Sequence, residues 1–174
     1  MLGDEENDFD TTVATFGEVV ALWYVDRVLT AEIVLAACDV LAAGADGPSL
    51  RMLAAVSIPD VRDEEVIDVL EAALREVGLP YAPKHTAAAR RVGLIAIARR
   101  TLSGIDTPQE LTHFARHEFW PPPEGSGCSE FDQLIVELAE MDDLYDEDMM
   151  CSDDEADARI TAQARRIVEL AHRY

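Results

Sequence analysis

The 174-residue sequence has a single lysine, Lys84, and few cations of any kind. Only 14 Lys and Arg residues stand against 35 Asp and Glu residues, which gives a net charge of −21. A chain with this charge repels nucleic acid phosphates and anionic membrane surfaces. We therefore exclude nucleic acid and membranes as expected partners and expect a basic protein as the natural counterpart.

Cysteine and long apolar runs are also scarce. Cys38, Cys128 and Cys151 show no spacing typical of a metal site or a disulfide framework, so we interpret them as free thiols in a reducing cytosol. No uninterrupted apolar stretch reaches the roughly 20 residues of a membrane helix. The first residues, "MLGDEENDFD", contain neither the basic region nor the apolar run of a secretory signal. These absences predict a cytoplasmic protein.

Apolar residues make up 49% of the chain, which is enough to build the core of one domain. Their spacing is helical almost throughout, and it is clearest in "DEEVIDVLEAALREVGLP", where Gly78 and Pro80 end the pattern. Thr30, Asp63 and Thr107 are predicted to cap helices. No stretch of useful length alternates apolar and polar residues, so no strand is predicted.

We therefore predict an all-α fold, a single-domain irregular bundle of about seven or eight helices. Residues 1–10 are expected to form an acidic, flexible N-terminus, and residues 11–174 a single helical domain. Two sub-bundles divided near residues 80–83 are the alternative, because prolines interrupt the helical pattern there.

The clearest catalytic candidates are His113 and His117 in "HFARH", which lie four residues apart on one helical face. Histidines at this spacing can bind zinc, but the glutamate of the H-E-x-x-H motif is missing. The sequence also lacks a nucleophile elbow, a P-loop and a G-x-G-x-x-G motif. We predict a non-enzymatic protein without a cofactor, and a metal-dependent enzyme that uses the histidine pair is the alternative.

The most unusual segment is "AEMDDLYDEDMMCSDDEAD", residues 139–157, where ten of nineteen residues are acidic and none is Lys or Arg. Methionines and a tyrosine lie among the carboxylates, a mixture that suits a contact surface. A solvated charge run is the alternative interpretation. The predicted partner-binding residues are Asp142, Asp143, Tyr145, Asp146, Glu147 and Asp148, with Trp120 as an aromatic anchor beside the proline-rich loop.

Three stretches together resemble a group of small acidic all-helical proteins of actinobacteria, some of which are similar to immunity proteins of toxin systems. The stretches are "LAAGADGPSLRMLAAVSIPDVRDEEVIDVLEAALREVGLP", "TPQELTHFARHEF" and "FDQLIVELAEMDDLYD", and the resemblance covers residues 41–146. It implies a helical fold and no catalytic residues. Together with the acidity, it predicts an immunity or antitoxin-like protein that neutralises a basic partner; a structural or regulatory helical module is the alternative.

Overall fold

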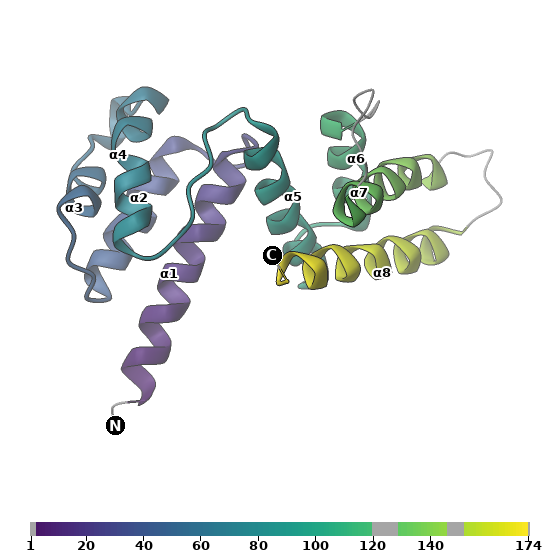
Figure 1. The fold of residues 1–174 in the computed structure, drawn as a ribbon, viewed down its shortest axis with the longest axis horizontal. Helices are drawn as coiled ribbons and strands as arrows, with labels where there is room; N and C mark the ends of the chain where they lie inside the picture. Colours follow the sequence, from purple (N-terminus) through teal and green to yellow (C-terminus); the bar gives the residue numbers. More distant parts are fainter. Residues whose placement is uncertain (1–2, 120–128, 146–151, 174) are drawn as a thin grey trace. The chain divides into compact units, whose positions relative to one another are not determined.

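The computed structural model describes residues 3–119, 129–145 and 152–173. These residues form eight α-helices and two short 3₁₀ helices, with no strand among them, which confirms the predicted all-α fold (Figure 1). None of the described helices is both long and apolar enough to cross a lipid bilayer. The elements are α1 (Gly3–Trp23), α2 (Thr30–Ala42), α3 (Pro48–Ala54), η1 (Ile58–Asp60), α4 (Asp63–Glu76), α5 (Ala87–Leu102), α6 (Pro108–Phe119), α7 (Glu130–Glu140), η2 (Met141–Tyr145) and α8 (Asp153–Ala171).

The chain divides into two compact units, which we call unit 1 (Met1–Gly93) and unit 2 (Leu94–Tyr174). The boundary lies inside α5, whereas the sequence placed a subdivision near residues 80–83. The proline-rich segment belongs to unit 1 because it is bound there: the Ala82 amide donates a hydrogen bond of 3.1 Å to the Tyr24 hydroxyl oxygen. Each unit is described separately below.

Unit 1 packs α1, α2, α3 and α4 around one apolar core, joined by the first turns of α5. Of the stripe predicted on α4, Val66, Leu70, Ala73 and Leu74 are buried in the core, and Val69 packs against it partly buried. Phe16 and Trp23 of α1 are the largest side chains that this core buries completely. Burying side chains of this size stabilises the unit through the hydrophobic effect.

Two predicted helix caps are wrong. Thr30 and Asp63 were expected to cap α2 and α4, but Leu29 and Arg62 occupy the cap positions, so each helix begins at the predicted cap residue itself, one residue earlier than expected. The two side chains contact each other instead: the Thr30 hydroxyl donates to the Asp63 carboxylate and accepts from Trp23 Nε1. This contact joins segments that lie 33 residues apart in the sequence.

The first helix begins earlier than expected. Residues 1–10 were predicted to form a flexible terminus, but α1 starts at Gly3 and runs without a break to Trp23.

Glu76 at the end of α4 caps the short helix α3 from a distance. Its carboxylate accepts hydrogen bonds from the Ser49 and Leu50 amides at 3.0 and 2.9 Å. It also lies where a side chain on Gly47 would be, so the absence of a Cβ there makes room for it. Burial acts to raise the pKa of Glu76, but the two amide hydrogen bonds outweigh it and lower the pKa.

We expect Glu76→Gln to lower the free energy of unfolding by less than the ~1 kcal/mol of a fully lost helix cap, because the glutamine carbonyl oxygen can still accept one of the two amide hydrogen bonds. A carboxyl with a lowered pKa in the folded state stabilises the protein above its unfolded pKa, and this contribution disappears as the pH falls through the folded pKa. The difference between wild type and variant in urea unfolding should therefore shrink in acid. Glu71→Gln, on the exposed face of the same helix, is the matched control and should change stability less.

Unit 2 contains the end of α5 with α6, α7, η2 and α8, and buries Leu94, Ile97, Leu111, Leu138 and Ile160 completely. Helix α7 ends at Glu140, and the 3₁₀ helix η2 follows it directly from Met141.

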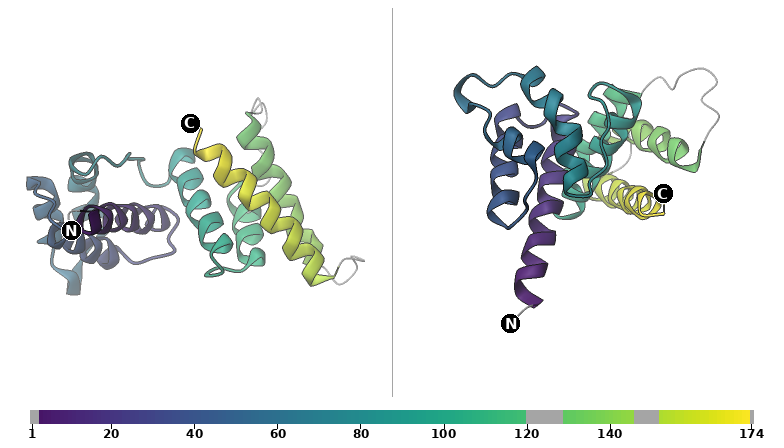
Figure 2. Two further views of the ribbon diagram at one scale, coloured as in Figure 1. Left: turned by 90° about the horizontal axis from the view of Figure 1, so that it is seen from below. Right: turned by 60° about the vertical axis from the view of Figure 1, so that its left-hand side comes forward.

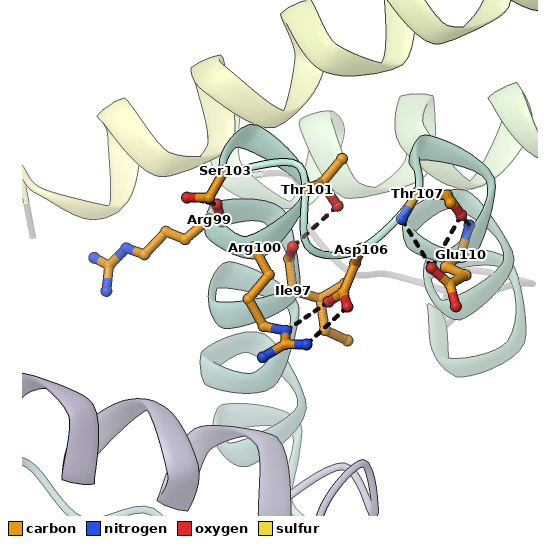
Figure 3. Close-up of polar contacts among 8 residues, drawn as sticks. All are labelled: Ile97, Arg99, Arg100, Thr101, Ser103, Asp106, Thr107 and Glu110. Carbon is orange, nitrogen blue, oxygen red and sulfur yellow. Dashed lines mark hydrogen bonds and ion pairs between the residues drawn. The ribbon is translucent and has the colours of Figure 1, made fainter.

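The turn from α5 to α6 is fixed by polar contacts. The Arg100 guanidinium donates two hydrogen bonds to the Asp106 carboxylate, at 2.8 and 3.0 Å (Figure 3). Thr107 and Glu110 then form the predicted capping box of α6, since the Glu110 amide donates to the Thr107 hydroxyl and the Thr107 amide donates to the Glu110 carboxylate.

Candidate functional site: an acidic surface on α7 and η2

Four carboxylates gather where α7 ends and η2 begins. We call the group the α7–η2 acidic surface: Glu137, Glu140, Asp142 and Asp143. The last turn of α7 contains no basic residue. The C-terminal end of a helix carries the negative end of its dipole, so carboxylates there are electrostatically unfavourable.

Other acidic residues of the chain lie where a helix favours negative charge. Asp153, Asp154 and Glu155 occupy the first turn of α8, and Glu64 and Glu65 the first turn of α4, where the helix dipole favours them.

In the α7–η2 acidic surface, Asp142 and Asp143 lie in the first turn of η2, whereas Glu137 and Glu140 lie at the C-terminal end of α7. Glu137 is paired with Arg166, whose Nη1 lies 3.6 Å from its Oε2. Glu140 is exposed at an unfavourable helix end, and a residue that breaks a local rule is a candidate for function.

Helix α6 holds η2 in place through two side chains. Thr112 is completely buried, and its hydroxyl lies 3.1 Å from Asp142 Oδ1 and 3.0 Å from the Gln109 carbonyl oxygen, so it can share its hydrogen between them. One turn further along α6, Arg116 Nη2 lies 3.5 Å from Asp143 Oδ1. Both aspartates are thus positioned by contacts with another helix.

Helix α8 holds the other side. The Tyr145 hydroxyl donates a hydrogen bond of 2.6 Å to Asp157 Oδ1. Burial, and then the hydrogen bond and charge of Asp157, raise the pKa of Tyr145. Gln163 of α8 is buried and donates to the Leu134 carbonyl at 3.1 Å and to Glu137 Oε2 at 2.9 Å. Contacts from α6 and α8 therefore fix the acidic surface on both sides.

Three of the predicted contact residues, Asp142, Asp143 and Tyr145, are brought together on η2. Their roles differ: the side chains of Asp142 and Tyr145 are engaged inside the protein, while Asp143 keeps 55% of its side chain exposed. The remaining predicted residues lie outside the described part of the chain: Asp146, Glu147, Asp148 and Trp120.

The charge around this surface is strongly one-sided. Residues 106–157 contain seventeen Asp or Glu residues and one Arg, namely Arg116, which is the residue that binds Asp143. Cations from other segments balance some of these carboxylates: Arg166 of α8 lies 3.6 Å from Glu137 Oε2, and Arg100 of α5 lies 2.8 Å from Asp106 Oδ2. A field of this sign attracts cations and cationic surfaces and raises their rate of encounter.

The predicted histidine pair lies beside this surface. The rings of His113 and His117 are 5.0 Å apart, and His113 Nδ1 is 3.9 Å from Asp142 Oδ2. No group of three or more His, Cys, Asp or Glu residues within the described ranges is arranged to hold a metal ion. Both histidines are exposed on α6, and 64% of the His113 side chain is accessible.

The second charged cluster lies in unit 1 around Lys84. Only 5% of the Lys84 side chain is exposed, and its ammonium lies 2.7 Å from Asp26 Oδ1 and 2.8 Å from Asp63 Oδ2. The ammonium also lies 4.2 Å from the centre of the Trp23 ring, whose Nε1 donates to the Thr30 hydroxyl at 3.1 Å.

Burial acts to lower the pKa of Lys84, but hydrogen bonds and charge from Asp26 and Asp63 outweigh it and raise the pKa. The ammonium is paired with two carboxylates and lies over an aromatic ring, all within the protein. We therefore interpret the cluster as a structural contact between segments of the fold and not as a substrate site. Asp63 and Asp26 lie 21 and 58 residues from Lys84 in the sequence, so no local pattern predicts them as its partners.

No protein-family model matches this chain, and neither a curated protein nor a solved structure was found to be similar to it. The resemblance to acidic helical proteins of actinobacteria therefore stays a prediction.

We expect Tyr145→Phe to lower the free energy of unfolding by about 1 kcal/mol, because it removes one hydrogen bond to a charged group. A phenol whose pKa is raised by folding contributes stability below its unfolded pKa, and loses it as the pH rises through the folded pKa. The effect should thus be present at neutral pH and fade in strong alkali. An absorbance titration of phenolate should show that the variant lacks one late-ionising tyrosine, and an unchanged late phase would contradict the assignment.

Proposed function

We propose that this chain is a non-enzymatic acidic binding protein of the immunity or antitoxin type, which neutralises a basic partner protein in the cytoplasm. The observation that carries the proposal is the α7–η2 acidic surface. Two of its carboxylates, Glu137 and Glu140, lie at the unfavourable end of α7, and contacts of Thr112, Arg116 and Tyr145 hold the η2 segment that bears the other two.

Such a surface suits fast and specific capture of a cationic protein. Complementary charge steers the encounter and raises association rates toward about 10⁸ M⁻¹s⁻¹ at low salt. Carboxylates that are already positioned lose less conformational entropy on binding than mobile ones do, so more of the interaction appears as affinity. Asp143 and Glu140 are exposed and are the described residues that we expect to touch the partner.

The test is capture of basic proteins from a lysate on the immobilised protein at two salt concentrations, about 0.05 M and about 0.5 M. Salt at the higher concentration screens charge interactions strongly, so proteins bound through charge should be retained only at the lower one. Purified partner is then measured against wild type and a Glu140→Lys/Asp143→Lys variant. We expect the variant to bind at least tenfold more weakly, chiefly through a slower association rate.

A Glu64→Lys/Asp68→Lys variant is the matched control, because it makes the same change in net charge on an exposed face of α4. We expect this control to keep most of the affinity. Equal loss in both variants would show that binding follows net charge alone, and would refute the acidic surface as the contact. Retention of no basic protein at low salt would refute the proposed function itself and favour a structural or regulatory module.

A further inference from the structure

Helix α6 carries two histidines on the side that faces solvent. Its opposite side is packed in unit 2, where Leu111, Phe114 and Ala115 are buried. Figures 1 and 2 show α6 beside the neighbouring helices of the same unit, and it contacts α7, η2 and α8. His113 and His117 are both exposed and lie four residues apart, so they are neighbours on one helical face. The packed helix therefore fixes the backbone positions of both histidines before any ligand binds.

The separation of the two rings fits a single metal ion. Their centres are 5.0 Å apart. A metal ion bound to an imidazole nitrogen at about 2.0–2.1 Å lies roughly 3.2 Å from the ring centre, so two rings that meet one ion at roughly 90–110° have their centres roughly 4.5–5.2 Å apart. The observed separation lies within this range. Exposed side chains rotate rapidly, so each ring can turn one nitrogen toward the ion.

A carboxylate lies next to one of the rings. Asp142 Oδ2 is 3.9 Å from His113 Nδ1, and Asp142 Oδ1 lies 3.1 Å from the hydroxyl of the buried Thr112. Histidines that bind metals commonly donate their second ring N–H to a carboxylate, which orients the ring. A hydrogen on Nδ1 that is directed toward Asp142 leaves the Nε2 lone pair of His113 for the ion. Asp142 is thus a positioning residue and not a ligand.

Two imidazoles select the class of ion. Imidazole suits zinc, nickel and copper, whereas carboxylates and water suit magnesium, calcium and manganese. Since no group of three or more His, Cys, Asp or Glu residues in the described part of the chain is arranged around a metal, the protein supplies two ligands and water completes the coordination. The seventeen acidic residues of segment 106–157 raise the local concentration of cations.

We propose that His113 and His117 form a two-histidine site for a divalent late transition-metal ion, with Asp142 positioning His113. The two imidazoles are held on one rigid helix, so the second binds as an intramolecular ligand and raises the affinity above that of a single histidine. The site needs neither a partner protein nor a reaction, so the inference does not depend on the proposed function.

The probe is Ni²⁺, which is titrated calorimetrically into the full chain in excess Mg²⁺. The Mg²⁺ occupies weak sites that consist of carboxylates alone. We expect one Ni²⁺ ion to bind per chain. Mn²⁺ measured in the same way should bind at least tenfold more weakly, because it binds imidazole less strongly than Ni²⁺ does.

His113→Ala and His117→Ala should each weaken Ni²⁺ binding at least tenfold, because one remaining imidazole cannot chelate the ion. His85→Ala and His172→Ala are the matched controls, since each removes an exposed histidine outside the pair, and both should leave the affinity unchanged. Ni²⁺ should raise the melting temperature of wild type and controls but not of the two pair variants. Circular dichroism checks that all four variants keep the same helix content.

A rescue variant tests the spacing of the pair. Gln109 is exposed on α6 and lies four residues before His113. His117→Ala/Gln109→His therefore builds a new pair with His113 at the same spacing, and we expect it to regain most of the affinity lost in His117→Ala. His117→Ala/Glu118→His also keeps two histidines on α6, but five residues apart on different faces, and should not regain it.

Two variants of η2 test the positioning role. Asp142→Asn keeps an acceptor for Thr112 and loses the charge that faces His113. We expect it to weaken Ni²⁺ binding several-fold while the melting temperature without metal changes little. Asp143→Asn makes the same change in charge on η2 and should weaken binding less.

An affinity for Ni²⁺ that is unchanged in His113→Ala or in His117→Ala would overturn the inference, because binding would then need at most one of the two rings. Equal affinities for Ni²⁺ and Mn²⁺ would also overturn it, because carboxylates would then be the ligands. Neither result bears on the proposed function, since capture of a basic partner is measured without added metal.

Discussion

Replacement of Lys84 by Met is expected to lower the free energy of unfolding by about 2–3 kcal/mol. Removing one partner of a fully buried ion pair costs about 3–5 kcal/mol, because the remaining charge stays buried and unpaired. Here Asp63 and Asp26 keep 41% and 68% of their side chains exposed, so water can partly replace the ammonium. The expected loss is reduced accordingly, and urea unfolding followed by circular dichroism measures it.

The pH dependence of this loss follows from the pKa shifts. Lys84 has a raised pKa, so its contribution is complete below its unfolded pKa and disappears as the pH rises through the folded value. For Asp63, burial acts to raise the pKa, but hydrogen bonds from Lys84 and Thr30 lower it, so its contribution holds above the unfolded pKa and is lost in acid. The difference between wild type and Lys84→Met should therefore be constant between about pH 5 and pH 9.

Two variants separate the parts of the Lys84 cluster. Lys84→Arg keeps the charge, but a planar guanidinium does not match a site built for a compact ammonium, so we expect an intermediate loss. Asp26→Asn removes one ion pair and keeps a residue type that tolerates the positive φ of 56° found there. It should cost less than Lys84→Met. A stability of Lys84→Met equal to wild type would contradict the role given to the cluster.

Leu138→Ala is expected to lower the free energy of unfolding by about 3 kcal/mol. Leu138 lies on α7 and is completely buried, and its truncation removes apolar contacts and leaves a cavity. Because Leu138 lies in unit 2, hydrogen exchange should accelerate in α6, α7 and α8 more than in α2, α3 and α4 of unit 1.

Val136→Ala on the same helix is the control for Leu138→Ala. Val136 is only partly buried, so its truncation should cost clearly less. Uniform acceleration of exchange across both units in Leu138→Ala would contradict the division of the chain into two cores.

The sequence was sufficient for elements whose signals are local. Helix α4 and its buried stripe followed from apolar spacing, and the cap of α6 from Thr107 and Glu110 three residues apart. It was insufficient where a contact with a residue far away in the sequence determines the role of a side chain. Thr30 does not cap α2; its hydroxyl donates instead to Asp63, which lies 33 residues away.

The same limit applies to the candidate site. Charge density alone pointed to Asp142, Asp143 and Tyr145. Thr112 and Asp157 position these residues, but nothing in the neighbouring sequence marks either as a contact of the site. A threonine inside a helix and an aspartate in an acidic run are both common. Their role depends on how α6, η2 and α8 pack together, and a pattern along the chain does not contain that information.

The central claim is that the acidic surface binds through its fixed arrangement and not only through its charge. Thr112→Val/Tyr145→Phe removes the hydroxyls that hold Asp142 and Asp157 and leaves the net charge unchanged. The most direct measurement is the affinity of this double variant for the captured basic partner at about 0.15 M salt. We predict a loss of about tenfold with helix content retained, whereas an affinity equal to wild type would show that charge alone accounts for binding and would contradict the account.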